Sequence, residues 1–267
     1  MPAYSQILAG LAILFMALER IWPRVAKQGV FRKGWLSDAG YVVFNSKYSG
    51  ILLGYVTAVW IGRLNGVLPS GWLRNWPWEA QFAALLIIVD LLKWCVHNLL
   101  HRVPWLWEFH KVHHSIVEMD WMGDWRFHWV ETIVYNSLLY VPTVCLGAPG
   151  GVGLGVGVVD TIIGHFAHAN LRWRIGWLKY VINSPEMHLW HHNHPESGPV
   201  NRNFGLTLSV WDWIFGTAYL PAHNPERLGF EGVERYPASL PAQWAAPFAA
   251  LAGWRGGPRP GGSIGSQ

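Results

Sequence analysis

Charged residues are scarce in this chain. Lysine, arginine, aspartate and glutamate make up 13% of its 267 residues, whereas hydrophobic residues make up 51%. An average soluble domain carries about 25% charged residues, so this composition argues against an ordinary soluble domain. The net charge of +4 comes from basic residues that flank apolar segments and form no single patch, which argues against a nucleic-acid-binding surface. We therefore expect an integral membrane protein.

Cysteine is also scarce. The chain has two cysteines, Cys95 and Cys145, and both lie within apolar segments. This number and placement exclude a disulfide framework and a zinc ribbon. We expect both cysteines to be packing residues.

The glycine-rich run at residues 147–160 has no phosphate-binding motif. It contains neither G-x-G-x-x-G nor GK[ST], and it precedes an apolar helix instead of following a strand. A nucleotide-binding loop is therefore not expected here. The four-residue spacing of Gly147, Gly151 and Gly155 predicts instead that two membrane helices approach each other closely.

Four long apolar segments are present, each poor in charge and bounded by aromatic, proline or basic residues. The last is about twice the length of one short span, so we expect a helical hairpin that breaks near residues 147–150. The segments are residues 3–18, 39–61, 80–101 and 132–164. They predict an all-α, polytopic membrane helical bundle with four to five spans, the first of which is retained and not cleaved. Buried core helices of a soluble protein are the alternative, because the shortest segments are marginal for a bilayer of about 30 Å.

Basic residues are distributed unequally between the first two loops. The loop after the first segment has five of them, and the next has Arg63 and Arg74. Because cytoplasmic loops carry the excess of basic residues, we expect the first loop to be cytoplasmic. Counting spans from there places every histidine cluster at the cytoplasmic face, in a histidine-rich helical cap.

Histidines recur at helical spacing. Residues three and four apart share one face of a helix, and the chain has four such sets. They are His97 and His101; His110, His113 and His114; His165 and His168; and His188, His191 and His192. A lone histidine would most often be a hydrogen-bonded core residue, but this many imidazoles in a charge-poor chain indicate a metal. Since one metal takes about four protein ligands, the number of histidines predicts two metals.

Acidic residues near the clusters are candidates to orient the imidazole rings. For any one of them a structural ion pair is the stronger alternative. The candidates are Asp90, Glu108, Asp120, Asp124, Glu131 and Glu186.

The ordered motifs resemble the fatty acid hydroxylase or sterol desaturase superfamily of membrane di-iron oxygenases. They are HNLLH (97–101), FHKVHHS (109–115), RFHWVE (126–131), HAN (168–170), SPEMHLWHH (184–192), NFG (203–205) and WDWIFGT (211–217). The resemblance covers residues 85–220 and implies two iron ions, O2 as co-substrate, and hydroxylation or desaturation of a lipid from the bilayer. It also implies an external electron donor, such as a ferredoxin, a cytochrome or a reductase, because no haem, flavin or nicotinamide motif is present.

The resemblance also assigns roles to particular residues. The nine implied metal ligands are His97, His101, His110, His113, His114, His168, His188, His191 and His192. Groups expected around the metals, as supporting residues or optional ligands, are His128, Glu131, His165 and Asp212. His194 and His223 are expected at the surface. The chain departs from the family pattern at Asn98, where an arginine is common, and at Asn201, where an aspartate is common.

The motifs suggest three parts of the chain. Residues 1–84 are expected to form N-terminal spans and loops, residues 85–220 the catalytic domain, and residues 221–267 an extension with a disordered tail. Two other functions remain open at this point. A metal transporter or store would place its site near the bilayer midplane, and a zinc-dependent hydrolase would need fewer ligands and commonly an HEXXH motif, which is absent.

Overall fold

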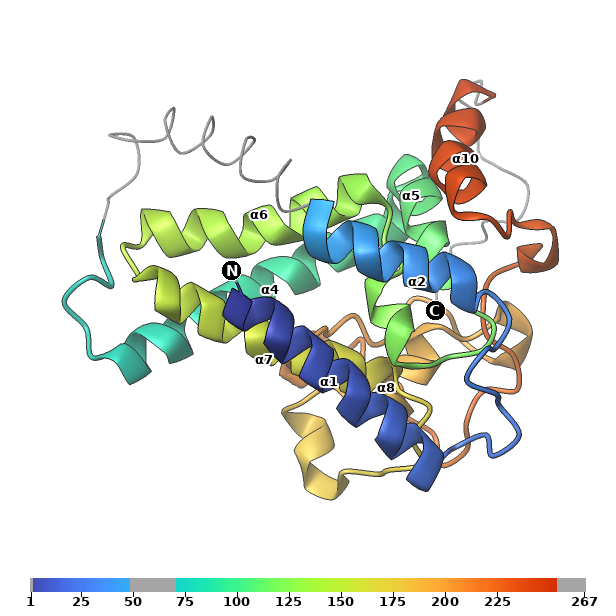
Figure 1. The fold of residues 1–267 in the computed structure, drawn as a ribbon, viewed down its shortest axis with the longest axis horizontal. Helices are drawn as coiled ribbons and strands as arrows, with labels where there is room; N and C mark the ends of the chain where they lie inside the picture. Colours follow the sequence, from blue (N-terminus) through green and yellow to red (C-terminus); the bar gives the residue numbers. More distant parts are fainter. Residues whose placement is uncertain (1, 49–70, 254–267) are drawn as a thin grey trace.

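A computed structural model describes residues 2–48 and 71–253, and within these ranges the regular elements are all helices (Figure 1). The prediction of an all-α fold is confirmed for this part of the chain. The α-helices are α1 (Pro2–Ile21), α2 (Trp35–Val43), α4 (Trp78–Arg102), α5 (Pro104–His114), α6 (Trp129–Cys145), α7 (Gly150–His168), α8 (Pro185–His191), α9 (Val210–Ile214) and α10 (Leu240–Ala252). A π-helix, η1 (Phe44–Tyr48), follows α2, and the 3-10 helices are η2 (Trp121–Trp125), η3 (Gly176–Tyr180), η4 (Pro195–Ser197) and η5 (Val233–Arg235).

Helices α4, α6 and α7 run side by side and form an elongated arm (Figure 1). Two described helices, α4 and α7, are long and apolar enough to cross a membrane by length and composition. The arm is held together by a buried apolar cluster to which all three helices contribute. Its members are Leu85 and Val89 of α4, Leu139 of α6, and Val152 and Val156 of α7.

The expected helical hairpin is present, but its glycines pack differently from the prediction. Helix α6 ends at Cys145 and α7 begins at Gly150. A Cβ added at Gly151 would have no neighbouring atom within 4 Å, and one added at Gly155 would lie 3.2 Å from Phe82 of α4. Gly153 instead packs against α6, where an added Cβ would lie 2.9 Å from Thr143. Because α7 has a neighbouring helix on each of two sides, its glycines divide between two faces.

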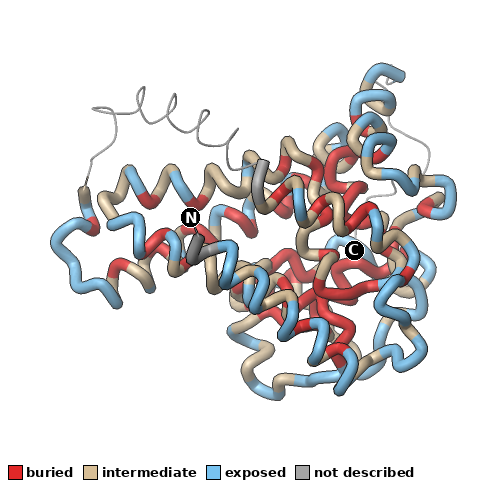
Figure 2. The backbone as a smooth tube through the Cα atoms, viewed as in Figure 1, coloured by how far each residue is buried: buried red, intermediate tan, exposed pale blue. Residues whose placement is uncertain are grey.

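The arm has exposed residues along its outer surface (Figure 2), and many of them are large hydrophobic residues. Leu92, Cys95 and Leu99 lie on one exposed face of α4, and similar side chains are exposed on α6 and α7. Exposed contiguous apolar surface is typical of a face that meets lipid. The prediction that Cys95 is a packing residue is wrong within the described chain, because this face of α4 points outward.

The number of membrane crossings remains a prediction. The second expected span, residues 39–61, lies mostly outside the described residues, as does the tail from residue 254. Helix α1 has 20 residues and contacts α7 and η2. The Glu19 carboxylate on α1 accepts hydrogen bonds from the backbone nitrogens of Trp121 (2.9 Å) and Asn170 (2.8 Å). The N-terminal helix is therefore anchored to the segments on either side of the hairpin.

A buried ion-pair network anchors the next N-terminal segment. Arg32 Nη2 contacts Asp38 at 2.6 Å and Asp120 at 2.5 Å, and Arg126 Nε also pairs with Asp38. The Asp38 side chain is fully buried, so removing its charge would leave two guanidinium groups short of an anion. The network thus joins the segment before α2 to η2 and Arg126.

Replacing Asp38 with asparagine should lower the free energy of unfolding by about 3 to 5 kcal/mol, the usual cost of breaking a buried pair from one side. Thermal unfolding of the purified protein in detergent measures this loss. The matched control is Glu196→Gln, which breaks an exposed pair with Arg227 and should change stability by less than about 1 kcal/mol. Equal melting temperatures for Asp38→Asn and the wild type would contradict a stabilising role for the network.

Candidate metal centre

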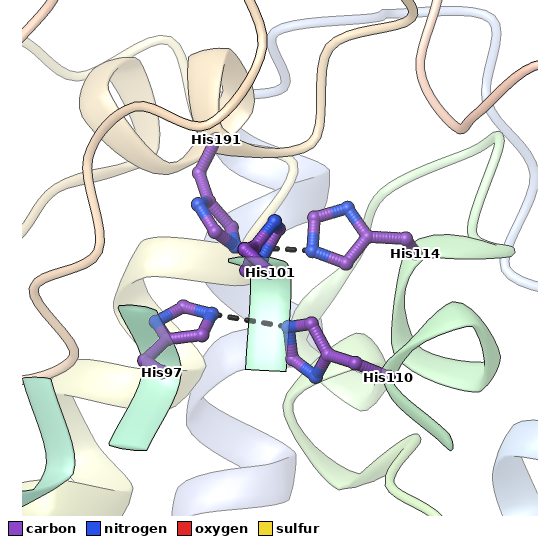
Figure 3. A group of neighbouring side chains, drawn as sticks. All are labelled: His97, His101, His110, His114 and His191. Atoms are coloured by element: carbon purple, nitrogen blue, oxygen red, sulfur yellow. Dashed lines mark hydrogen bonds between the residues drawn. The ribbon is translucent and has the colours of Figure 1, made fainter. Parts of the chain in front are cut away.

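Nine histidines converge at the end of the arm where α4, α5, α7 and α8 meet. They form two groups, and the candidate ligand atoms within each group lie within 4.8 Å of one another. The five-histidine group consists of His97, His101, His110, His114 and His191, whose rings point toward one another (Figure 3). The four-histidine group consists of His113, His168, His188 and His192. These are the nine residues that the sequence singled out.

The helical spacing explains how each motif divides between the groups. Histidines four apart belong to the same group: His110 and His114 to one, and His188 and His192 to the other. The histidine at the i+3 position goes to the opposite group, so α5 contributes His113 to the four-histidine group. Each H-x2-HH motif therefore contributes to both groups, and the two groups share helices α5 and α8.

Hydrogen bonds fix the tautomer of six of the nine rings. In each of these, Nδ1 faces an oxygen acceptor, so it carries the proton and leaves the Nε2 lone pair free. The pairs are His97 with Phe204 O (2.8 Å), His101 with Asn201 Oδ1 (3.2 Å), His110 with Glu131 Oε1 (2.7 Å), His113 with Arg126 O (3.2 Å), His168 with Gly164 O (2.8 Å) and His191 with Arg202 O (2.9 Å). Four of the six acceptors are backbone carbonyls.

Each group contains two Nε2 atoms that face each other with lone pairs only. In the five-histidine group these belong to His97 and His110, 3.1 Å apart. In the four-histidine group they belong to His113 and His168, 3.3 Å apart. Neither nitrogen of such a pair can donate a proton while both Nδ1 atoms are protonated, so the contact is repulsive unless a cation lies between them. This donor arrangement fits a metal ion in each group.

The four-histidine group has a closed arrangement of nitrogens. Its Nε2 atoms are separated by 3.3 Å (His113–His168), 2.9 Å (His168–His188), 3.1 Å (His188–His192) and 3.0 Å (His192–His113). With metal–nitrogen bonds of about 2.1 Å, two ligands at right angles lie about 3.0 Å apart, so the spacing is that of neighbouring ligands on one ion. The Nδ1 atoms of His188 and His192 are buried and have no hydrogen-bond partner among the described residues.

Burial keeps these imidazoles neutral. It lowers the pKa of His110, His113 and His114 on α5 well below the usual value, and neighbouring histidines lower it further. The same causes lower the pKa of His188 and His192. A neutral imidazole is the form that binds a metal.

Two of the six acidic candidates contact histidines. Glu131 at the start of α6 accepts from His110 Nδ1, and Asp124 in η2 lies 2.8 Å from His165 Nδ1 and 3.7 Å from His168 Nδ1. Gly164 makes the approach of Asp124 possible, because a Cβ at that position would collide with its carboxylate.

The other four acidic candidates pair with residues other than the histidines. Asp90 accepts from the backbone nitrogen of Thr207, Glu108 from Lys111, and Asp120 from Arg32. Glu186 lies 3.8 Å from Arg174.

The remaining histidines lie outside both groups. His128 Nε2 donates to the Trp244 carbonyl of α10 at 3.1 Å, and His165 packs against Trp121 and Trp125. His194 is 4% exposed, so its predicted surface position is wrong. Its Nδ1 accepts a hydrogen bond from the backbone nitrogen of Glu196, so the side chain caps the start of η4. His223 is exposed, as expected.

Asp212 holds the turn that orients one of the histidines. Its carboxylate accepts from Phe204 N (2.8 Å), Gly205 N (2.7 Å), Trp94 Nε1 (3.1 Å) and Thr217 Oγ1 (2.6 Å). Glycine is required at position 205, because a Cβ there would lie 2.5 Å from the Leu208 carbonyl oxygen. The carbonyl of Phe204 in the same turn accepts from His97 Nδ1, so Asp212 acts on His97 through the backbone.

Backbone carbonyls and Asn201 are the functional groups that the sequence reasoning did not assign. The carbonyls orient four of the rings, and any residue can supply a carbonyl, so sequence offers no signal for them. Asn201 had drawn attention as a departure from the family pattern. In the structure it stands at φ 59° and its Oδ1 faces His101 Nδ1. An amide thus orients His101 where an aspartate would supply a carboxylate.

Replacing Glu131 with leucine should lower the metal affinity of the five-histidine group by about 10 to 100-fold, because His110 loses the carboxylate that orients it. Competition with a chelator, followed by metal analysis of the protein, measures the change. Glu186→Leu is the matched control, since Glu186 pairs with Arg174 and belongs to neither histidine group. A Glu131 variant that retains both metals as strongly as the control would contradict the orienting role.

A cavity of about 440 Å³ lies beside the four-histidine group, between α4, α6 and α7. Its lining includes His168 and His188, and among the described residues it includes no member of the five-histidine group. The lining extends along α7 from His168 to Gly150, about 27 Å at 1.5 Å per residue. Leu139, Val144 and Leu154 line the part near the hairpin turn, so this part of the cavity is suited to an apolar chain.

Comparison with known proteins agrees with the site. The family model described as fatty acid hydroxylase matches residues 82–217. The chain is 34% identical to an ornithine lipid hydroxylase of Rhizobium tropici over 182 residues, which cover 66% of this chain and 53% of that protein. It is 25% identical to human alkylglycerol monooxygenase over 146 residues (55% of this chain, 31% of that protein). It is 47% identical to the fatty acid hydroxylase vlmA of a Lecanicillium species over 169 residues (54% and 44%).

The chain thus spans about half the length, or less, of these curated relatives. No solved structure matches. The family match covers the part of the chain that holds all nine grouped histidines. On this evidence the chain belongs to the fatty acid hydroxylase family.

Proposed function

We propose that this protein is a membrane-bound di-iron lipid hydroxylase. The observation that carries the proposal is the position of the four-histidine group, whose inward lone pairs adjoin a largely apolar cavity. The cavity volume is within the range of about 300 to 1,000 Å³ that is usual for small-molecule sites. The names of the three relatives, all lipid hydroxylases or monooxygenases, support the same reaction class.

The residues have distinct roles in this proposal. The nine grouped histidines hold two iron ions, and Glu131 and Asp124 orient rings. When bound, the iron pair supplies the activation of O2 that is needed to oxidise an unactivated C–H bond. The cavity orients the lipid and excludes water from the reacting carbon. Hydroxylation of one C–H bond by O2 consumes two electrons and two protons and releases water, so an external donor such as a ferredoxin, a cytochrome or a reductase supplies the electrons.

Labelled oxygen tests the reaction. Purified, iron-loaded protein is incubated with a lipid extract, a chemical reductant and ¹⁸O₂, and the lipids are analysed by mass spectrometry. We expect a lipid that gains one labelled oxygen atom, and no such product from protein lacking iron. A product that has lost two hydrogens and gained no oxygen would indicate desaturation instead. Absence of any O2-dependent product from protein with both metals bound would contradict the proposal.

The proposal places the site at the cytoplasmic face of the membrane. Single reporter cysteines at Gln28 and Val117, in a Cys95→Ser, Cys145→Ser background, should both react with an impermeant reagent from the cytoplasmic side. A reporter near Gly71 should react from the opposite side. Labelling of Gln28 and Val117 from different sides would contradict this topology. The native cysteines are removed so that the reporter is the only thiol in the chain.

A further inference from the structure

An ion pair lies within the arm, in the wall of the cavity. Lys93 of α4 and Asp160 of α7 both line the cavity, and their side chains are 11% and 15% exposed. Both belong to helices that are long and apolar enough to cross a membrane. Charged side chains at such positions are costly and commonly serve a function. The pair therefore needs an explanation beyond the packing of helices.

The carboxylate of the pair has both oxygens occupied. One Asp160 oxygen contacts Lys93 Nζ, and the other accepts from Thr207 Oγ1 at 2.5 Å. The Lys93 ammonium differs, because it has three donors and contacts a single acceptor among the described residues. Two donors of a largely buried cation are thus available at the cavity wall.

The lining of the cavity changes character along its length. Lys93 lies one helical turn before His97, and Asp160 lies eight residues before His168, about 12 Å along α7. From the ion pair toward the hairpin turn, the lining residues are uncharged and mostly apolar, among them Leu139, Val144 and Leu154. A molecule that fills the cavity can therefore place an apolar chain toward the turn and a polar group at Lys93.

The charges around Lys93 limit which kind of polar group can bind there. Lys93 is accompanied by two carboxylates, Asp160 and Asp90, and Asp90 is held one turn earlier on α4 by the backbone nitrogens of Thr207 and Leu208. The local site thus has no excess positive charge to offset an anion. A free carboxylate or a phosphate would be repelled by the two aspartates, whereas a neutral carbonyl oxygen can accept a hydrogen bond from Lys93 without adding charge.

We infer that Lys93 donates a hydrogen bond to the ester or amide carbonyl of an acyl lipid whose chain lies along α6 and α7 toward the hairpin turn, so that the carbon presented to the four-histidine group lies on the head-group side of that carbonyl. This inference rests on the proposed function, because it names the substrate class of the same cavity. It makes Lys93 a substrate-binding residue that selects acyl lipids over chain-matched ethers. It also gives a role to a lysine that lies among apolar helices.

Binding without turnover tests the inference. The full-length, metal-loaded protein in detergent is titrated with three probes of equal chain length: an N-methyl fatty amide, the corresponding methyl alkyl ether, and the free fatty acid anion. Competition with a fluorescent fatty amide gives each affinity. Because a hydrogen bond from a charged donor is worth at least about tenfold in affinity, we expect the amide to bind at least that much more tightly than the ether.

Substitutions at the ion pair give the second part of the test. In Lys93→Met the affinity for the amide should fall to that for the ether, and the affinity for the ether should not change. The double variant Lys93→Met/Asp160→Asn should give the same result without leaving Asp160 unpaired, and Lys179→Met, at a lysine outside the cavity, is the matched control. Metal content and melting temperature show that each variant is folded.

Three results would overturn the inference. They are equal affinities of the wild type for amide and ether, undiminished amide binding by the folded double variant, and tighter binding of the anion than of the amide. The first and third need no variant, so misfolding of a variant leaves the inference open to refutation. The binding assay contains neither reductant nor O2, so its result does not depend on turnover. A lack of hydroxylation in the separate labelled-oxygen assay would contradict the proposed function and would leave the measured affinities unchanged.

Discussion

Replacing His113 with alanine should reduce the metal content from two ions per chain to one and abolish O2-dependent lipid oxidation. His113 Nε2 lies 3.0 Å from that of His192 and 3.3 Å from that of His168, so it contributes to the ring of four nitrogens beside the cavity. The variant keeps only three of the four candidate ligands in the group that adjoins the cavity. Even the loss of a group that merely orients a ligand costs about 10 to 100-fold in affinity or activity, and loss of a ligand should cost more.

Metal analysis and the labelled-oxygen assay measure this effect on protein purified from matched expression. His223→Ala is the control, because His223 is exposed and belongs to neither group. An exposed substitution of this kind changes stability by about 0.5 kcal/mol or less. His191→Ala, on the other side of the shared helix α8, should remove the metal of the five-histidine group instead. A His113 variant with two metals and full activity would refute the assignment of the four-histidine group.

Replacing Asp212 with alanine should lower the free energy of unfolding by about 4 kcal/mol or more. The substitution leaves four buried donors without their acceptor, and each unsatisfied donor costs about 1 to 3 kcal/mol. The turn that carries the Phe204 carbonyl should loosen, so His97 loses the acceptor on Nδ1. Metal should therefore be lost from the five-histidine group before the four-histidine group.

Thermal unfolding and metal analysis of Asp212→Ala and Asp212→Asn distinguish a positioning role from a chemical one. Asparagine keeps the size of the side chain and one acceptor oxygen, so we expect an intermediate loss of stability and of metal. An asparagine variant with wild-type stability and both metals but no turnover would show that Asp212 acts in the reaction itself. The control Glu234→Ser, at an exposed acid paired with Arg227, should leave both properties unchanged.

The sequence was informative about the site because helical periodicity places ligands without long-range information. Three and four residues are close to one helical turn, so the motif His110-x2-His113-His114 predicts convergent imidazoles from α5 alone. The same reasoning applies to His188, His191 and His192. It could not show that His113 and His114 serve different groups, because the division depends on where α7 and α4 place His168 and His97.

The limits of the sequence reasoning have equally specific causes. Cys95 was expected to be a packing residue because it lies within a predicted span, but a membrane helix is apolar on its lipid-facing side as well. His194 was expected at the surface, but it is buried beside the segment that carries Arg227, a contact between distant residues. Gly151 was expected at a helix contact by spacing, and spacing does not specify which side of α7 meets α6.

Composition and helical spacing are local properties, so they were enough to predict the all-helical class and a two-metal histidine site, and the resemblance carried by the ordered motifs singled out the nine ligands and implied a lipid hydroxylase. The packing of the helices was needed to establish how the histidines divide into groups of five and four, which ring nitrogens hold lone pairs, and which group adjoins the cavity. Those features depend on backbone carbonyls such as those of Phe204 and Gly164, and on Glu131 reaching His110 from a different helix. A carbonyl is common to every residue, so its position relative to a ring is set by the contacts between helices.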